Sequence, residues 1–147
     1  MLATTSQKGT VIRFFDCSSG SKLHEVRRGS EPAIINYLHF EHTSSKYLVC
    51  TSNKDTVHVF KTLDKSNNSG NTKSYFSMLS PFIPGAGDEW SYAQVKLPPR
   101  EVKDSMLIAS CTKDQMAVVS TEGTIYMSAL PATGGVAPIN YQFKFNI

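Results

Sequence analysis

The chain has 147 residues and a net charge of +3 at pH 7, and 40% of its residues are hydrophobic while 18% are charged. This length fits one ordinary domain, and the composition excludes a disordered chain. The small net charge excludes strong bulk attraction to polyanions, so any anion binding must depend on local placement.

Patterns typical of β-strands run along the whole chain, and no stretch has a convincing helical period. Short runs rich in β-branched and aromatic residues are bounded by small or polar residues. The expected strands are residues 2–5, 10–15, 21–26, 33–40, 46–52, 56–60, 90–96, 105–111, 115–120, 124–129 and 139–146. The sequence therefore predicts an all-β protein.

One pattern, which we call the turn motif, occurs three times. It begins with serine, continues with two or three small or polar residues and a threonine, and ends in a β-branched or aromatic run. The copies begin at Ser6, Ser52 and Ser120, and another β-rich run precedes each copy. Each copy therefore predicts a tight turn that feeds a strand of a β-hairpin.

The spacing of the turn motifs indicates a propeller. The first two copies are 46 residues apart, close to the repeat of roughly 40 to 45 residues for a four-stranded blade. The third follows after 68 residues, and a long insert at about 61–89 accounts for the excess. About eleven strands amount to a little under three blades, whereas a closed propeller typically needs four to eight. We therefore expect residues 1–147 to form a partial β-propeller, the C-terminal part of a larger one.

Two adjacent arginines, Arg27 and Arg28, lie between the first two turn motifs and are followed by Gly29. Neighbouring strand residues point in opposite directions, so the two guanidinium groups can face two separate pockets. Each presents a planar fork suited to phosphate, and we expect Gly29 to let the backbone turn beside them. The alternative is that the pair is only a solvated turn. The excess basic charge of the chain lies around this pair, since residues 1–30 hold five basic and two acidic side chains.

The stretches around this pair resemble a known family. They are residues 2–13, the Arg27-Arg28-Gly29 triplet, residues 51–60 and residues 89–94 with the sequence Glu-Trp-Ser-Tyr-Ala-Gln. They are similar to the PROPPIN family, the phosphoinositide-binding, seven-bladed, WD-repeat-like propellers that include the WIPI proteins of autophagy. The resemblance runs from Met1 to the end of the chain and implies equivalence with blades five, six and seven.

The resemblance implies two lipid head-group sites, one for each arginine. The first would comprise Thr4, Ser6, Gly9, Thr10, Arg13 and Arg27. The second would comprise Arg28, Gly29, Ser52, Thr56 and His58. Hydroxyls, backbone N–H groups, guanidinium forks and a histidine N–H are suitable ligands for phosphate monoesters. The alternatives are that the threonines simply begin strands, that the serines bond their own turns and that the histidine fills space between strands.

One residue departs from the pattern of the first site. Asp55 stands in the second turn motif where the first has Gly9. An exposed carboxylate beside an anion pocket repels phosphate by roughly 1 kcal/mol or less. We therefore expect the second site to be the weaker one.

The long insert corresponds to the family's membrane-inserting loop. Its second half contains six apolar or aromatic side chains, namely Tyr75, Phe76, Met78, Leu79, Phe82 and Ile83. Such side chains can lie in the head-group zone of a bilayer. The alternative is that part of this segment packs on the blade as it approaches Trp90, which we expect in the blade core.

The resemblance implies a non-enzymatic protein that recognises phosphatidylinositol 3-phosphate and phosphatidylinositol 3,5-bisphosphate in autophagosome formation. It implies a cytoplasmic protein, peripheral on preautophagosomal, endosomal or vacuolar/lysosomal membranes, with proteins of the autophagy machinery as partners. The alternative is a protein-interaction propeller scaffold without functional lipid sites.

Other functional classes find little support in the sequence. No nucleophile-and-base motif indicates an enzyme, and no cofactor is implied. Three widely spaced cysteines support neither a zinc site nor a disulfide framework. The basic residues form no stripe interleaved with aromatic residues, so nucleic-acid binding is not expected.

Overall fold

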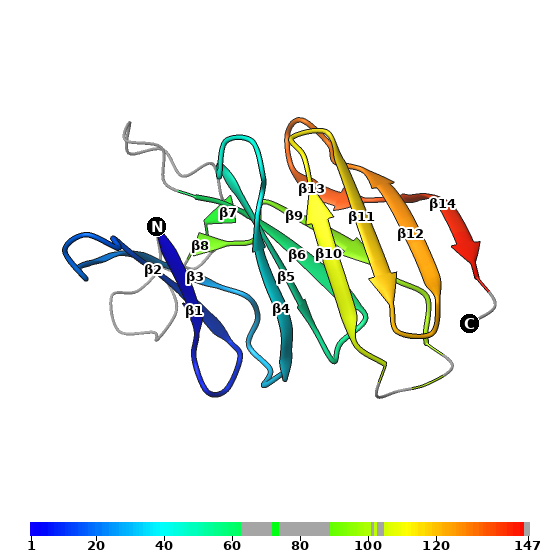
Figure 1. Cartoon of the computed structure of the whole chain (residues 1–147), viewed down its shortest axis with the longest axis horizontal. Helices are drawn as coiled ribbons and strands as arrows, with labels where there is room; N and C mark the ends of the chain where they lie inside the picture. The colour runs from blue at the N-terminus through cyan, green and yellow to red at the C-terminus, as the bar shows by residue number, and fades with distance from the viewer. Residues whose placement is uncertain (63–71, 74–88, 101, 103–104, 146–147) are drawn as a thin grey trace.

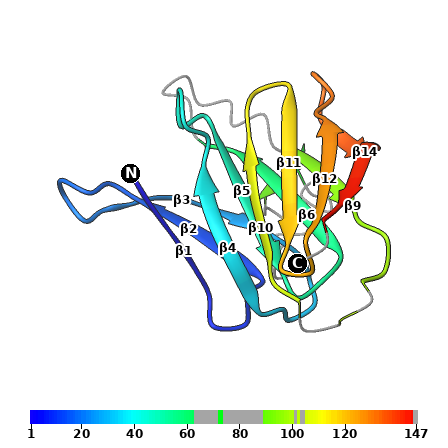
Figure 2. The same ribbon diagram turned by 45° about the vertical axis from the view of Figure 1, so that its right-hand side comes forward.

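Strands make up the regular structure of the chain. The computed structural model describes residues 1–62, 72–73, 89–100, 102 and 105–145. Within these residues the strands form three sheets that follow one another along the molecule (Figure 1). In the turned view β1 (Leu2–Thr5) and β2 (Val11–Phe15) still lie on the left, while strands of the second and third sheets overlap (Figure 2).

The first sheet is built on β1 (Leu2–Thr5), β2 (Val11–Phe15) and β3 (Lys22–Arg27), which pair antiparallel in chain order. Its remaining strands come from later in the sequence. β8 (Glu89–Trp90) pairs parallel with β3, and β7 (Thr72–Lys73) pairs antiparallel with β8. The β-branched and aromatic residues of β2 suit such a pleated, half-buried surface.

The second sheet contains β4 (Ile35–Phe40), β5 (Tyr47–Ser52), β6 (Thr56–Lys61) and β9 (Ala93–Lys96), each antiparallel to the next. β13 (Gly135–Ala137) pairs parallel with β9 at the other edge of that strand. Successive residues of β5 and β6 are buried, so both faces of this sheet are covered.

The third sheet contains β10 (Leu107–Cys111), β11 (Gln115–Ser120), β12 (Thr124–Ala129) and β14 (Ile139–Lys144), again antiparallel in this order. Buried and exposed residues alternate along β10. This sheet therefore has one covered face and one exposed face.

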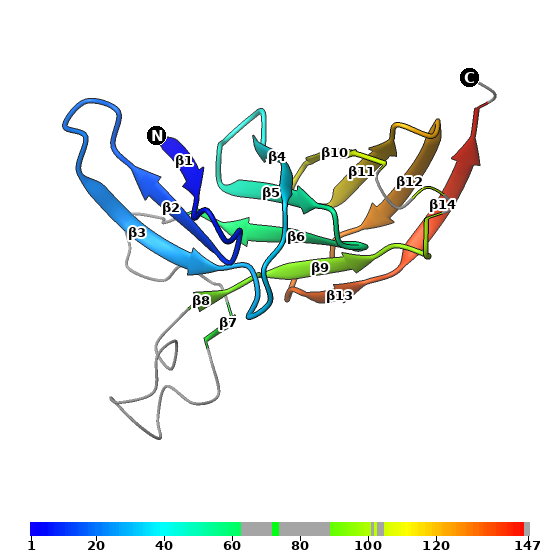
Figure 3. The same cartoon turned by 90° about the horizontal axis from the view of Figure 1, so that it is seen from below.

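The three sheets are the blades expected from the sequence. Each expected strand is present, which confirms an all-β partial propeller of about three four-stranded blades. Seen from below, β1, β4 and β10 lie toward one side of the array and β3, β9 and β14 toward the other (Figure 3). The structure adds the short strands β7 and β13 and divides the expected strand 90–96 into β8 and β9. Equivalence with blades five to seven stays a prediction, and the insert at about 61–89 lies mostly outside the described residues.

The core lies in two layers between the sheets. The layer between the first and second sheets consists of Ile12, Phe14, Val26, Leu48, Cys50 and Phe60. The larger second layer includes Val49, Val57 and Val59 of the second sheet and Leu107, Ala109, Met116 and Val118 of the third. Alternate residues of β5 and β6 thus face opposite neighbours, which makes the second sheet the middle layer.

The first turn motif contacts the linker to the second sheet at Gly9. The φ angle of Gly9 is +65°, and a Cβ there would lie 2.0 Å from the carbonyl oxygen of Ala33. Gly29 differs, because its φ lies outside the left-handed region and a Cβ would meet no atom within 4 Å. The backbone at Gly29 therefore adopts ordinary angles, so the chain after Arg28 does not use the conformational freedom of glycine.

We expect Gly9→Ala to lower the free energy of unfolding by more than about 2 kcal/mol, because the methyl group collides with a backbone carbonyl at a left-handed position. Gly29→Ala is the matched control and should stay within about 0.5 kcal/mol of the wild type. Urea unfolding of both variants measures the difference. Equal losses would contradict the contrast between the two glycines.

Candidate functional site

The two arginines leave the first sheet in opposite directions, as the sequence predicts. Val26 is 1% exposed in the core layer between the first and second sheets. Arg28 lies two residues further along and is also buried, at 5% exposure, whereas Arg27 is half-buried at the end of β3. The alternation of strand side chains therefore turns Arg28 toward the second sheet and Arg27 toward the far face of the first.

Arg28 joins the first turn motif to the linker before the second sheet. Its Nε donates to the carbonyl oxygen of Gly9 at 2.6 Å, and its Nη2 donates to the carbonyl oxygen of Glu31. Its backbone N–H donates to the carbonyl oxygen of Thr10 at 2.8 Å. Burial lowers the pKa of the guanidinium, which nevertheless stays charged at neutral pH. Gly9, predicted in the first site, thus contacts the arginine predicted in the second.

Three residues of the predicted first site, Thr4, Arg13 and Arg27, lie on the far face of the first sheet. Thr4 is the cross-strand partner of Arg13, and Val11 is that of Arg27, so all four residues share one face. Sequence reasoning missed Glu25, the cross-strand partner of Arg13 on this face. Its carboxylate accepts from the Nε of Arg13 at 2.8 Å. The charge of Arg13 is therefore partly neutralised. The sequence could have indicated Glu25, because it lies two residues before Arg27 and therefore on the same face of β3.

His58 lies on the face of β6 that points toward the first sheet, alongside Phe60. It is 5% exposed, and its Nδ1 lies 3.3 Å from the hydroxyl oxygen of Ser91. Burial, and after it the charge of Arg28, lowers the pKa of His58 to about 4. The imidazole is therefore neutral at pH 7, and one ring nitrogen can donate while the other accepts.

The hydroxyl and strand-start residues of the two predicted sites take the positions that their turns require. The side-chain oxygen of Ser6 accepts from the backbone N–H of Val11, and that of Ser52 accepts from Lys54. Each serine therefore bonds its own turn, which was the alternative to a ligand role. Thr10 directly precedes β2 and Thr56 begins β6, and both are half-buried.

Asp55 is paired, which changes its expected effect on the second site. Its Oδ1 accepts from the Nε of Arg100 at 2.8 Å, and the Arg100 side chain is only 3% exposed. Arg100 also donates to the carbonyl oxygens of Asn53 and Ser105. The sequence predicted an exposed carboxylate at Asp55 and gave no indication of Arg100, which lies 45 residues away along the chain. The pairing weakens the expected repulsion of phosphate.

The sequence of the chain matches the model of a known protein family. A sequence model of the PROPPIN family matches residues 1–106. The chain belongs to the PROPPIN family. PROPPIN proteins are non-enzymatic and bind phosphoinositides, which agrees with the expectation that the chain is not an enzyme.

Individual PROPPIN relatives match most of the chain. It is 31% identical to autophagy-related protein 18 of Caenorhabditis elegans over 155 residues, covering 92% of this chain and 37% of the relative. It is 32% identical to WD repeat domain phosphoinositide-interacting protein 1 of Xenopus laevis over 149 residues, covering 91% and 34%. The fold matches Hsv2 of Kluyveromyces lactis with a TM-score of 0.72 at 22% identity, covering 98% of this chain and 43% of that one. The chain thus spans less than half of each of these proteins.

Some PROPPIN features predicted from the sequence lie outside the described residues. They are the loop side chains Tyr75, Phe76, Met78, Leu79, Phe82 and Ile83, and the side chain of Trp90. Within the described part, no helix has the length and apolar character needed to cross a membrane. The same residues contain no group of three or more side chains that could hold a metal ion.

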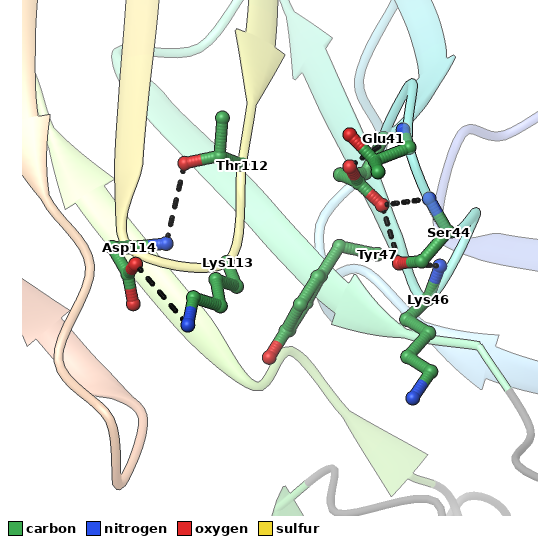
Figure 4. A pocket seen from close by; sticks show the side chains of 8 residues that line it. Glu41, Ser44, Lys46, Tyr47, Thr112, Lys113 and Asp114 are labelled. Atoms are coloured by element: carbon green, nitrogen blue, oxygen red, sulfur yellow. Dashed lines mark hydrogen bonds and ion pairs between the residues drawn. The ribbon is translucent and has the colours of Figure 1, made fainter.

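The loops that follow β4 and β10 lie at the opposite end of the sheets from the turn motifs (Figure 1). A separate pocket of about 540 Å³ lies there (Figure 4). It lies between the loops that follow β4 and β10 and is lined by Glu41, Thr43, Ser44, Lys46, Tyr47, Thr112, Lys113 and Asp114. Hydrogen bonds from Ser44 and Thr43 lower the pKa of Glu41 to about 2. None of the predicted head-group residues lines this pocket.

We expect the free energy of unfolding to fall as the pH is lowered from 6.5 to about 4, the range in which His58 stays neutral in the folded protein. The unfolded chain protonates this residue near pH 6.5 and the folded chain only near pH 4. Below pH 6.5 the unfolded state therefore binds more protons, and the free energy of unfolding should fall by about 3 kcal/mol by pH 4.

Urea unfolding at pH 7, 6, 5 and 4 measures this effect, and His58→Gln should flatten the slope. Glu41 contributes only at lower pH, because its lowered pKa removes stability below its ordinary value of 4.5. In the interval from pH 6.5 to 5, the difference in slope between the wild type and His58→Gln therefore reports His58 without a contribution from Glu41. An unchanged slope in the variant would refute the assignment.

Proposed function

We propose that this PROPPIN chain recognises phosphatidylinositol 3-phosphate and phosphatidylinositol 3,5-bisphosphate on membranes and acts in autophagosome formation. The observation that carries the proposal is the divergence of Arg27 and Arg28 to opposite faces of the first sheet. One guanidinium for each pocket is what two separate head-group sites require.

The chemistry of each site supports phosphate as the ligand. Phosphate monoesters carry nearly two negative charges and several acceptor oxygens, so donors in each pocket must outnumber acceptors. Arg27 lies on a face that also carries Arg13 and Thr4, with Glu25 as the opposing charge. The first site thus offers two cations against one carboxylate.

The second site offers a buried cation beside a neutral donor. Arg28 is charged and 5% exposed, and its field contributes to holding His58 neutral. In such a low-dielectric setting an attraction between ions is stronger than in water. The open space beside Gly29 leaves room for a ligand to approach the backbone. With Asp55 paired to Arg100, we propose that this site is functional as well.

Membrane attachment would come from several weak contacts acting together. Two head-group sites and the loop that carries Phe76, Leu79 and Phe82 form a multivalent unit whose avidity exceeds that of any single contact. We propose a cytoplasmic protein, peripheral on preautophagosomal, endosomal or vacuolar/lysosomal membranes. Two of the named relatives support this context, since one is an autophagy-related protein and the other is a phosphoinositide-interacting protein.

A protein-interaction scaffold is the second candidate function, with proteins of the autophagy machinery as partners. The pocket of about 540 Å³ between the loops after β4 and β10 favours it, because this pocket lies apart from the head-group residues. Recruitment of a fluorescent fusion to autophagic membranes separates the two functions. Recruitment that survives loss of both Arg27 and Arg28 would support the scaffold.

We expect the double change Arg27→Thr and Arg28→Thr to abolish co-sedimentation with liposomes that contain phosphatidylinositol 3-phosphate, because each pocket loses its guanidinium. Arg27→Thr alone should weaken binding with a smaller loss of stability than Arg28→Thr, because Arg27 is half-buried and Arg28 is buried. Arg28→Thr alone should also destabilise the fold, because the carbonyl oxygens of Gly9 and Glu31 lose their donor. Co-sedimentation and thermal unfolding together separate the two effects.

The double change Lys46→Thr and Lys113→Thr is the matched control. It removes the same two charges, but from the exposed loops at the opposite end of the sheets. Liposome binding by this control should equal that of the wild type. Undiminished liposome binding by the arginine double variant would contradict the proposal. Equal losses of binding in both double variants would show that net charge, and not two specific sites, causes the binding.

We expect the triple change Phe76→Asp, Leu79→Asp and Phe82→Asp to weaken liposome binding at least tenfold, because charged side chains are costly in the bilayer interface. Binding of soluble inositol 1,3-bisphosphate, measured by calorimetry, should change little. Equal losses in both assays would show that the loop serves the fold rather than the membrane.

A further inference from the structure

Arg100, in the linker between β9 and β10, binds the second turn motif at two positions. Its Nε donates to Oδ1 of Asp55 and its Nη2 donates to the carbonyl oxygen of Asn53, each at 2.8 Å. Both residues lie between Ser52 and Thr56, two of the predicted ligands of the second head-group site. A guanidinium can hold both positions at once because its donors have a fixed mutual geometry. Arg100 therefore fixes the turn that presents these two ligands.

The remaining donor of Arg100 is anchored at the start of the third sheet. Its Nη1 donates to the carbonyl oxygen of Ser105, which is buried. Leu107 begins β10 two residues further along and is fully buried in the core layer between the second and third sheets. Its carbonyl oxygen accepts from the hydroxyl of Thr51 at 2.6 Å, and Thr51 directly precedes the turn motif. The anchor thus belongs to the packed core, where side chains have little freedom to move.

The first turn motif is held in the same way by Arg28. The Nε of Arg28 donates to Gly9, the fourth residue of the first motif, and Asp55 is the fourth residue of the second. The two arginines differ in what else they do. Arg28 is also the predicted cation of the second site, whereas the charge of Arg100 is paired with Asp55 and its side chain is only 3% exposed. Arg100 therefore shares the holding role of Arg28 without access to a ligand.

The carboxylate of Asp55 faces away from the second site. His58 lies on the face of β6 toward the first sheet, and Thr56 shares that face because strand side chains alternate. Val57 lies on the other face, in the core layer toward the third sheet. Asp55 is on the side of Val57 by the same alternation, which agrees with its ion pair to Arg100. Its charge is thus turned from the phosphate pocket and balanced by a cation.

We propose that Arg100 is a positioning residue of the second head-group site, which it serves by fixing the turn between Ser52 and Thr56 through Asp55 and Asn53. This inference rests on the proposed lipid-binding function. It reverses the role expected of Asp55, because the carboxylate then supports binding at the second site instead of opposing it.

The test titrates the full ¹⁵N-labelled chain with inositol 1,3-bisphosphate and follows its amide signals. Signals of Thr4 and Arg13 report the first site, and signals of Gly29 and His58 report the second, so one sample gives both affinities. Arg100→Lys keeps the charge but loses the three fixed donors. It should weaken the second site about fivefold and leave the first site unchanged, because the turn of the second site alone loses its hydrogen bonds.

Two changes at Asp55 separate positioning from charge. Asp55→Asn removes the charge but keeps an acceptor for Arg100, and it should retain the wild-type affinity of the second site. Asp55→Ala also removes the acceptor and should weaken that site about threefold. Repulsion of phosphate by the carboxylate predicts the opposite sign, since both changes would then tighten binding by up to about fivefold. Tighter binding by Asp55→Ala would overturn the proposal.

A measurement without ligand distinguishes positioning from a general loss of fold. The ¹⁵N order parameters of residues 53–55 should fall in Arg100→Lys, while those of residues 7–9 in the first turn motif stay as in the wild type. Unchanged order parameters at residues 53–55 would contradict the holding role of Arg100.

Tyr92→Phe is the matched control at the same joint. The hydroxyl of Tyr92 donates to the carbonyl oxygens of Pro131 and Ala132, and its ring contacts Tyr47 of the pocket at the opposite end from the turn motifs. The control should therefore lower the thermal stability and leave both affinities unchanged. Weaker binding by this control, or equal losses at both sites in Arg100→Lys, would overturn the proposal.

The outcome is separable from that of the proposed function. Absence of binding at both sites of the wild type would overturn the proposed function and this inference with it. Saturable shifts in the wild type, with a second-site affinity that Arg100→Lys and Asp55→Ala leave unchanged, would overturn this inference alone.

Discussion

The structure depends on one buried guanidinium, that of Arg28, which holds the first sheet to the linker of the second. Strands within a sheet are joined by ladders of backbone hydrogen bonds, whereas the first and second sheets meet mainly through packed side chains and a few hydrogen bonds, such as that from the backbone N–H of Ala33 to the carbonyl oxygen of Lys8. A charged group at such a joint must be fully hydrogen-bonded, because an unsatisfied buried charge is costly. Arg28 meets this condition in part, because two of its five guanidinium N–H groups donate to the carbonyl oxygens of Gly9 and Glu31. The close approach of this turn to the linker requires a glycine at position 9, because a Cβ there would collide with Ala33.

This arrangement gives one residue a structural and a binding role. The hydrogen bonds that fix Arg28 in the fold also fix the position of its charge, which is the preorganisation that recognition of a small anion requires. Arg27 is half-buried and faces away from the core layer between the first and second sheets. Loss of function at Arg28 therefore carries a contribution from stability, and only variants that separate the two can assign its share to the ligand.

Much of this arrangement could be predicted from the alternation of side chains along a strand, in which successive residues point to opposite faces. It correctly gave the strands and the divergence of Arg27 from Arg28, because both follow from local geometry. It could also have found Glu25, which lies two residues before Arg27 on the same face. The pairing of Asp55 with Arg100 was beyond its reach, because the two residues are distant in sequence and meet only when the linker after β9 folds back. The neutral state of His58 likewise depends on burial between two sheets, which no local pattern encodes.

The parallel pairing of β13 with β9 ties the second blade to a segment that belongs, in sequence, to the third. The free edge of β9 is thereby covered, which protects it from pairing with another chain. During synthesis this cover arrives late, because residues 135–137 leave the ribosome some forty positions after β9 does. Until then the second blade exposes the unpaired edge of β9. Nascent chains of this protein therefore pass through an interval in which a chaperone could cover this edge and prevent aggregation.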